Sequence, residues 1–471
     1  MTGLVLTFQA VLWLSIALAF IGSRNASIFH PFTIYLVFHG MVFVFRPILE
    51  NVLNFDRTFF WMMFYPTDDQ IQTTLILTSL ALVVFALASW VLVPAEPRFD
   101  RRLPGRFTTA EWWALGVVVT LLSPVIAYSL YASLTSATPG DDVGGALIQM
   151  DRDVNSGIAT YTNTTGYIAE AEKCLGGICV MVAWGSRFRL WSFIPLVFYV
   201  TERTYIGWSR WTIVLTVMMV ILVYIAYRRR RWMPIGMIAI ALPTFLLFQQ
   251  LGENRDAFKQ LVLGTAPRDQ GPVDNRNWLE KQDGPDFANF DFLTYVMDVV
   301  PEKTGTYTYF AQNLQLFTEP IPRILWPNKP IGEPIKFFDL NDYGNFEGLT
   351  WSLVGDGWIS GGWLGVVITM IAVGYGLGRL HRWFWRGDAT HFKILAYCTL
   401  LPLTVLTYRD GVISIAKFAF FTMTPLMLWH IVVQAHLSLR RARADQRTRL
   451  MGRAASPLQV GNAIGAPTRQ S

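Results

Sequence analysis

The chain has 471 residues, of which 52% are hydrophobic and only 15% are charged. Soluble proteins of this length carry more charge, so the composition excludes an ordinary soluble protein and indicates several membrane-spanning helices. The formal net charge of +6 is too small to indicate nucleic-acid binding, and we expect it to come from basic loops on one side of a membrane.

Eleven apolar runs are predicted to span the membrane as helices of about 20 residues each. The first run has no basic residues before it and no clear cleavage site, so we interpret it as a membrane helix and not as a signal peptide. In chain order the runs are 4–21, 29–49, 71–93, 112–131, 167–184, 188–204, 209–227, 232–250, 358–380, 392–408 and 412–436.

Lys and Arg in the short loops between these runs predict the orientation of the chain. When the eleven spans alternate, every basic cluster falls on one side of the membrane, which is then the cytoplasmic side. The N-terminus is predicted to lie outside and the C-terminus inside. The clusters on the inner side are Arg24, Arg98, Arg101, Arg102, Arg106, Arg228–Arg231, Arg379, Arg382, Arg386 and the tail that begins LRRARADQR.

A long segment, 251–357, falls on the outer side and is too long, at about 100 residues, to be a simple connection. We expect its second half to hold amphipathic helices that lie on the membrane. The chain is therefore predicted to have four parts. These are eight spans in 1–250, the outer loop 251–357, three spans in 358–437 and a basic, disordered tail in 438–471.

Four arginines are predicted to lie at outer helix ends. Arg203 and Arg210 fall between the sixth and seventh spans, Arg255 follows the eighth, and Arg409 separates the last two. A guanidinium binds phosphate through two hydrogen bonds and stays charged when partly dehydrated, so this pattern indicates an anionic ligand. The alternative is that each arginine reaches lipid headgroups or pairs with a neighbouring acid.

Acidic residues on the same side offer a general base. Asp356, between Gly355 and Gly357 at the start of the ninth span, could accept a proton from a sugar hydroxyl, and the glycines allow a ligand or a helix to approach closely. Its alternative role is to cap the N-terminus of that helix. Asp68 and Asp69 would suit a metal-dependent transferase, and their alternative role is to cap the third span.

Several kinds of site are not predicted. The three cysteines lie in apolar runs and the outer loops contain no histidine, so the sequence indicates neither a disulfide framework nor a metal site. Phosphate-binding loops, zinc-protease motifs and serine-hydrolase motifs are also missing from the sequence. We therefore predict no cofactor, and any transferase activity would need an activated donor carried by the membrane.

The stretch EPIPRILWPNKPIG, residues 319–332, contains four prolines, which favour a stiff, extended path. Trp326 can lie at the membrane interface or stack on a sugar, whereas Arg323 and Lys329 can face lipid phosphate. The alternative is that the segment is a rigid strap that covers the bundle.

Together, PIPRILWPNKPIGEP and the following GDGWISGGWLG resemble the bacterial oligosaccharide repeat-unit polymerases, the Wzy-type O-antigen polymerases. SRW, residues 209–211, is similar to the outer Ser-Arg of these polymerases and of the O-antigen ligases. The resemblance covers about residues 200–415. The chain departs from the ligases because its outer loops lack a histidine.

The resemblance implies an all-α polytopic enzyme of the bacterial inner membrane with a GT-C-like architecture. Such enzymes move a growing glycan from undecaprenyl pyrophosphate to the non-reducing end of the next lipid-linked repeat unit, at the periplasmic face and without nucleotide or metal. A chain-length regulator and a flippase would be partners. The implied pyrophosphate ligands are Arg210, Arg255 and Arg409, supported by Arg203, Arg323, Lys329 and Trp326, with Asp356 or Glu253 as the base.

Two other functions stay open. One is another polyprenyl-linked glycosyltransferase, either an O-antigen ligase or a polyprenyl-phosphate-sugar transferase in which Asp68 and Asp69 would act. The other is a polysaccharide exporter or flippase. That class is expected to have symmetric halves and short loops, whereas this sequence has a single large loop late in the chain.

Overall fold

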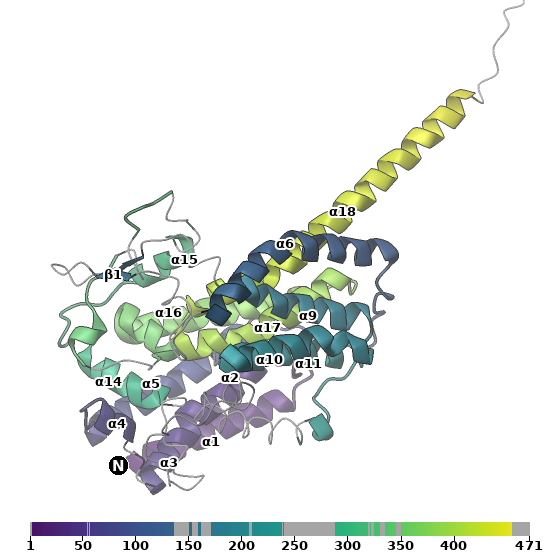
Figure 1. Cartoon of the computed structure of the whole chain (residues 1–471). Coiled ribbons are helices and arrows are strands. Elements are labelled where there is room, and N and C mark those ends of the chain that lie inside the picture. Colours follow the sequence, from purple (N-terminus) through teal and green to yellow (C-terminus); the bar gives the residue numbers. More distant parts are fainter. Residues whose placement is uncertain are drawn as a thin grey trace, which may run out of the picture.

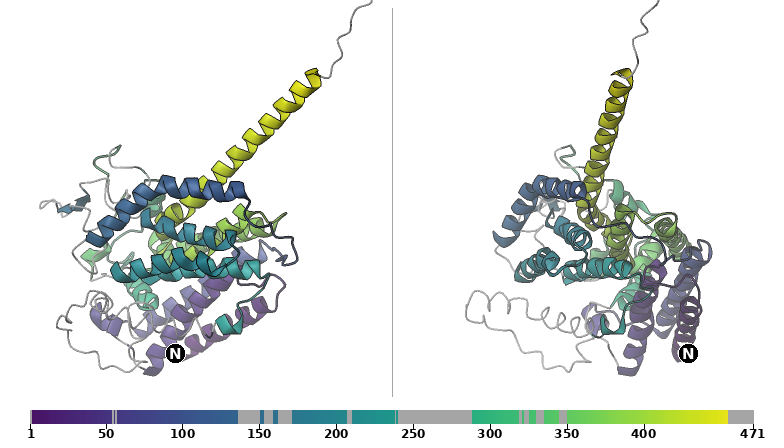
Figure 2. Two further views of the ribbon diagram at one scale, coloured as in Figure 1. Left: turned by 45° about the vertical axis from the view of Figure 1, so that its right-hand side comes forward. Right: turned by 90° about the vertical axis from the view of Figure 1, so that its right-hand side faces the viewer.

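The computed structural model is a bundle of helices from which the last helix, α18, extends as a long rod (Figures 1 and 2). One short antiparallel hairpin, β1 (Met150–Arg152) with β2 (Ala159–Tyr161), is the only sheet among the described residues. The structure describes residues 2–53, 55, 57–135, 150–152, 159–161, 171–206, 210–237, 239, 288–318, 321, 325–329, 335–344 and 350–454.

Helices, long and short, account for most of the described chain. Before the hairpin they are α1 (Thr2–Ile21), α2 (Pro31–His39), the π-helix η1 (Gly40–Phe45), α3 (Arg46–Leu53), α4 (Arg57–Trp61), α5 (Asp68–Ala86), the π-helix η2 (Leu87–Val91) and α6 (Thr109–Thr135). After it come η3 (Ala171–Lys173), α9 (Cys174–Gly185), η4 (Leu190–Phe193), α10 (Ile194–Ile206), α11 (Arg210–Tyr227), α14 (Asn289–Val299), η7 (Ala311–Leu314), α15 (Gln315–Thr318), η8 (Leu340–Asp342), α16 (Ser352–Trp385), α17 (His391–Asp410) and α18 (Ser414–Ala454).

Within the described residues, six helical segments are long and apolar enough to cross a membrane. They confirm a long apolar helix at the first four predicted spans, the ninth and the last. Large apolar side chains point outward from them, including Leu4, Leu121, Leu364 and Ile431, as a lipid environment requires. The chain is therefore an all-α candidate multi-pass membrane protein. The six segments are Gly3–Ile21, Pro31–Leu53, Asp68–Val91, Thr109–Tyr131, Ser352–Trp385 and Ser414–Gln446.

The other predicted spans have different outcomes. α9 and α10 have only 12 and 13 residues, and α11 is a shorter apolar helix, Trp211–Tyr227. The predicted run 232–250 lies mostly outside the described residues. α17 has 20 residues and lies in the interior, where it is buried at almost every position from Ile394 to Tyr408.

Small residues let the helices of the bundle approach closely. A Cβ on Gly177 of α9 would collide with the backbone oxygen of Thr422 in α18, and a Cβ on Gly378 of α16 would lie 2.8 Å from the backbone oxygen of Ser89 in η2. Inside a bilayer, helices associate through packing of this kind because burying apolar surface away from lipid gains little free energy. These glycines therefore determine how closely the helices pack.

α16 consists of two helical segments joined at Gly361 and Gly362. Gly362 has φ +59° and ψ −138°, a conformation that residues with a side chain rarely adopt. The chain bends so sharply that a Cβ added to Gly365 would collide with the backbone oxygen of Gly357 in the first segment. The close approach predicted for the glycines beside Asp356 is thus confirmed at Gly357, and its partner is the second segment of the same helix.

Loops that carry the predicted basic clusters lie together at one end of the bundle, which we call the basic end. Arg231 donates hydrogen bonds to two backbone carbonyls in the turn after α1. Arg101 donates to a carbonyl at the end of α16 at 2.6 Å, and Arg187 donates to two carbonyls in the loop before α6. Alternating spans predict the same result, namely that the loops carrying these basic residues lie at one end of the bundle.

Two predictions about segments outside the spans differ from the structure. α14 does not lie on a membrane surface, because its residues from Asn289 to Val296 are all buried or nearly so and it packs against α5 and α16. α18 continues as a helix to Ala454, so residues 438–454 are helical where disorder was predicted. Arginine, alanine and leucine make up most of this stretch, and such residues readily extend a helix that is already formed.

Candidate functional site

Polar side chains gather at the end of the bundle opposite the basic end, where α14, the start of α16 and the end of α17 meet. Asn289 of α14 joins the three elements. Its side-chain amide donates to the backbone oxygens of Thr350, at 2.7 Å, and Arg409, at 3.0 Å. One residue of the long loop therefore holds the end of α17 beside the beginning of α16, and we call this junction the candidate site.

Asp356 lies inside the first segment of α16 and is almost fully buried, with 3% exposure. Its two carboxylate oxygens accept hydrogen bonds from Gln312 and from the backbone N–H of Val412, each at 3.1 Å. The helix begins after Trp351, so Asp356 does not cap it, and that alternative is wrong. The carboxylate instead fixes the turn between α17 and α18 to the long loop.

Of the predicted cations whose side chains are described, Arg409 is the most open to solvent. Its side chain has 16% exposure, lies 3.6 Å from the Asp410 carboxylate and stacks over the ring of Trp211 at 5.1 Å. Trp211 follows Arg210 in α11, so the ends of α11 and α17 that carry the two predicted arginines are neighbours. The side chain of Arg210 itself lies outside the described part of the structure.

Asp410 is a polar residue of this site that the sequence did not single out. Its carboxylate is 23% exposed. Burial raises the pKa of Asp410 above its ordinary value, and the neighbouring Arg409 and a hydrogen bond with Thr350 act in the opposite direction. A carboxyl group with a raised pKa is better matched to proton transfer near neutral pH. Its position next to Arg409 in the turn YRDG was the available sequence signal.

For Arg203 the structure agrees with the alternative prediction, in which the arginine pairs with acidic residues. It is completely buried in α10, lies 2.6 Å from Glu172 and 3.6 Å from Glu202, and stacks over Tyr199 at 5.4 Å. Buried charges persist where they are paired in this way. The guanidinium therefore connects α10 to η3 and does not reach the surface to meet a ligand.

The described part of the proline-rich stretch also behaves as a structural element. Lys329 is 8% exposed, and its ammonium donates to the Ile321 carbonyl at 3.2 Å. Trp326 is half-buried. These contacts favour the rigid strap for this stretch. Three further predicted site residues, Glu253, Arg255 and Arg323, lie outside the described residues.

The acidic pair before the third span does not cap it, so that alternative is wrong, although the two residues lie where they can stabilise the helix. Asp68 and Asp69 are exposed in the first turn of α5, where negative charge is favourable. The cap itself is Thr67, which exchanges hydrogen bonds with Gln70 in a capping box.

A buried ionic cluster near the site was not predicted. Arg46, at the start of α3, lies 2.8 Å from Asp291 of α14 and 2.7 Å from Glu50 on its own helix. The side chains of Arg46 and Asp291 are 2% and 0% exposed. An arginine in the apolar sequence VFVFRPIL was the available signal, because such a charge requires an acidic partner. The pair joins the second span to the long loop.

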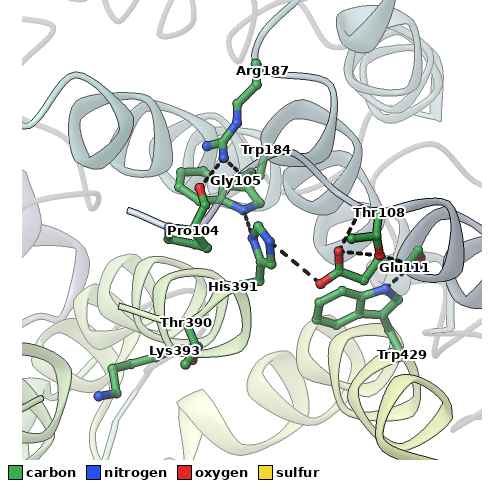
Figure 3. A network of polar contacts seen from close by, with 10 residues as sticks. All are labelled: Pro104, Gly105, Thr108, Glu111, Trp184, Arg187, Thr390, His391, Lys393 and Trp429. Carbon is green, nitrogen blue, oxygen red and sulfur yellow. Dashed lines mark hydrogen bonds and ion pairs between the residues drawn. The ribbon is translucent and has the colours of Figure 1, made fainter. Parts of the chain in front are cut away.

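A second polar network lies at the basic end and joins four helices (Figure 3). His391 Nδ1 accepts a hydrogen bond from the Trp184 indole at 2.8 Å, and its Nε2 lies 3.6 Å from the Glu111 carboxylate. The Glu111 backbone oxygen accepts from Trp429 at 2.9 Å. Since Nδ1 accepts, the imidazole must be neutral with its proton on Nε2. The network is structural and connects α6, α9, α17 and α18.

This network predicts acid sensitivity. Burial is the main cause that lowers the pKa of His391, Glu111 opposes it, and Arg187 adds to it. Above pH about 6.5, histidine is neutral in both folded and unfolded chains. As the pH falls below that value the unfolded chain binds a proton first, so stability should fall by at most about 1.4 kcal/mol per pH unit. His391→Gln should make the decline in Tm between pH 7.5 and 5.5 less steep than in the wild type. His436→Gln, outside the network, should keep the wild-type slope, and equal slopes in the two variants would contradict the assignment.

No family model, curated protein or solved structure matches this chain. The argument for a function therefore rests on the residues of the candidate site and on the membrane character of the fold.

Proposed function

We propose that the protein is a membrane glycosyltransferase that polymerises lipid-linked oligosaccharide repeat units. It transfers the growing glycan from undecaprenyl pyrophosphate to the non-reducing end of the next lipid-linked unit. The observation that supports this most is Arg409, a partly exposed guanidinium held over Trp211 at the end of the bundle opposite the basic end. A cation fixed at that level is suited to a lipid that carries its charge at the membrane surface.

In this proposal the chain spans the bacterial inner membrane eleven times with a GT-C-like architecture. The candidate site faces the periplasm, as does the N-terminus, and the basic end lies in the cytoplasm. A flippase that supplies the repeat units and a chain-length regulator are the proposed partners. The donor is activated by its own pyrophosphate, so the proposed reaction requires neither nucleotide nor metal.

The residues of the candidate site have defined roles in the proposed reaction. Arg409, with Arg210 at the head of the neighbouring helix, stabilises negative charge that develops on the departing pyrophosphate. Asp410, with its raised pKa and partial exposure, accepts the proton of the attacking sugar hydroxyl. Asp356 positions the turn that carries both groups through its hydrogen bond to Val412. The roles of Glu253 and Arg255 stay predictions.

The test is chain elongation by purified protein in liposomes that contain lipid-linked repeat units, with product length measured on a gel. Arg409→Gln should slow elongation by about 10²–10³-fold, the usual effect of removing one group that stabilises developing charge. The matched control is Arg382→Gln, which removes an exposed arginine at the basic end and should keep the wild-type rate.

Three outcomes would contradict the proposal. Wild-type elongation by Arg409→Gln would remove the role of this arginine. Transfer of a single unit to a lipid core would indicate a ligase, and movement of lipid-linked glycan across the bilayer without lengthening would indicate a flippase or exporter.

A further inference from the structure

At the basic end, a hollow with a volume of about 580 Å³ opens between the loop before α6 and the ends of α9 and α11. We call it the basic hollow. Among the residues that the structure describes, its wall contains five arginines and no acidic side chain, together with Tyr227 and loop residues 103–105. The arginines are Arg106, Arg187 and Arg228–Arg230.

The backbone at two helix ends places arginines at this hollow. α9 ends with Arg187 in the left-handed region at φ +59°, and the Phe188 N–H closes the turn on the Ala183 oxygen at 2.9 Å. α11 ends in the same way, with Arg229 at φ +55° and the Arg230 N–H bonded to the helix at 3.1 Å. Glycine or asparagine normally occupies this position. Both helices have arginine there, and both arginines line the same hollow.

Within the described part of the chain, no acidic side chain lines the hollow to balance its positive charge. The C-terminus of each helix contributes roughly half a negative elementary charge, so the two ends supply about −1. Five guanidinium groups supply +5. The difference leaves about four positive charges around one cavity, far more than the helix ends can offset. Four of these arginines, Arg106 and Arg228–Arg230, are exposed to water, and an excess of positive charge around one hollow attracts anions.

Arg187 is held in place before any ligand binds. It donates to the Pro104 oxygen at 2.5 Å, and its guanidinium lies 4.5 Å from the Trp184 ring and 5.3 Å from the Tyr227 ring. Its other terminal nitrogen, Nη1, is buried and has no hydrogen-bond partner among the described residues. Burial lowers the pKa of Arg187, and the neighbouring Arg106 adds to this effect. A bound anion would offset both.

We propose that the basic hollow is a binding site for phosphate groups that together carry at least two negative charges. α11 is apolar from Trp211 to Tyr227 and then enters the hollow directly, so the hollow lies where lipid headgroups would begin. Basic pockets at the ends of membrane helices bind the headgroups of anionic lipids. The inference is independent of the proposed glycosyltransferase activity.

Binding to the full-length protein in detergent can be measured by native mass spectrometry and by the shift in Tm. The probes are cardiolipin, phosphatidylcholine and inorganic pyrophosphate. Cardiolipin should bind at least about tenfold more tightly than phosphatidylcholine, since only the former is anionic. The double variant R228Q/R230Q should lose at least about tenfold in affinity for the anion, because it removes two of the five guanidiniums.

The matched control is R382Q/R386Q, which removes two exposed charges near the same end but outside the hollow. It should change the affinity less than about twofold. Equal losses in the two double variants would overturn the proposal, because they would show attraction to overall charge only. No preference for cardiolipin or pyrophosphate over phosphatidylcholine would also overturn it.

The pyrophosphate measurement distinguishes the source of the phosphate. If pyrophosphate displaces cardiolipin in the wild type, the hollow recognises the phosphates of a lipid headgroup. If pyrophosphate binds with the same dependence on Arg228 and Arg230 while cardiolipin does not bind, the ligand is a soluble phosphate compound. Should R228Q/R230Q fail to fold, Arg106→Gln gives the same test, because Arg106 lines the hollow from an exposed loop.

Discussion

Replacement of Arg46 by methionine should lower the free energy of unfolding by about 3–5 kcal/mol, the usual effect of removing one partner from a buried ion pair. The change leaves Asp291, which is 0% exposed, without the guanidinium 2.8 Å away. Asp291→Asn should have a smaller effect because Glu50 lies 2.7 Å from Arg46 and remains to neutralise it. Unfolding of the purified protein in detergent, by heat or by SDS, would measure both changes.

The matched control for this prediction is an exposed ion pair whose acidic partner also lies on α14. Lys303 pairs with Asp298 of α14 at 2.7 Å, but the two side chains are 50% and 18% exposed. Lys303→Met should therefore change the free energy of unfolding by no more than about 1 kcal/mol. If Arg46→Met and Lys303→Met lowered stability equally, the buried cluster would have no special role in holding α14.

A second large effect is expected at the bend of α16. Gly365→Ala should destabilise the protein by about 1–3 kcal/mol, because the added methyl would collide with the Gly357 backbone and side-chain rotation cannot relieve the collision. The first segment of α16 would have to move, and with it Asp356 and its hydrogen bond to Val412. We therefore expect a loss of elongation activity together with a lower Tm.

Gly376→Ala provides the comparison within the same helix. Gly376 is exposed, and a Cβ there would meet nothing within 4 Å. This substitution should be neutral or stabilise the helix by up to about 1 kcal/mol. A Tm that fell as far in Gly376→Ala as in Gly365→Ala would show that any alanine is harmful in α16, and the packing at the bend would then not be the cause.

The membrane helices could be predicted because their signal is local. A run of apolar residues specifies a span from its own composition, and this was sufficient for α1, α5 and α6. The same criterion failed to separate α9 and α10 from full-length spans, since their apolar runs include turns and 3₁₀ segments. Helix length depends on where the chain turns, and the positions of turns within an apolar run cannot be read from hydropathy.

The roles of individual polar residues depended on partners far away in the sequence. Arg203 looked like a surface cation until Glu172, from η3, was found beside it at 2.6 Å. Asp356 looked like a cap or an exposed base, whereas it holds a turn that begins more than fifty residues later. In both cases the partner comes from another helix or turn, and one sequence cannot show which elements pack together.

The distance along the chain between Arg46 and Asp291 also determines how long Arg46 exists before Asp291 is synthesised. The two residues are separated by 245 positions. At about 5–20 residues per second, the ribosome needs roughly 10–50 s to reach the second after making the first. Throughout that interval Glu50, four residues after Arg46, is the carboxylate within reach. A newly inserted second span can therefore keep its arginine neutralised until α14 is synthesised and completes the cluster.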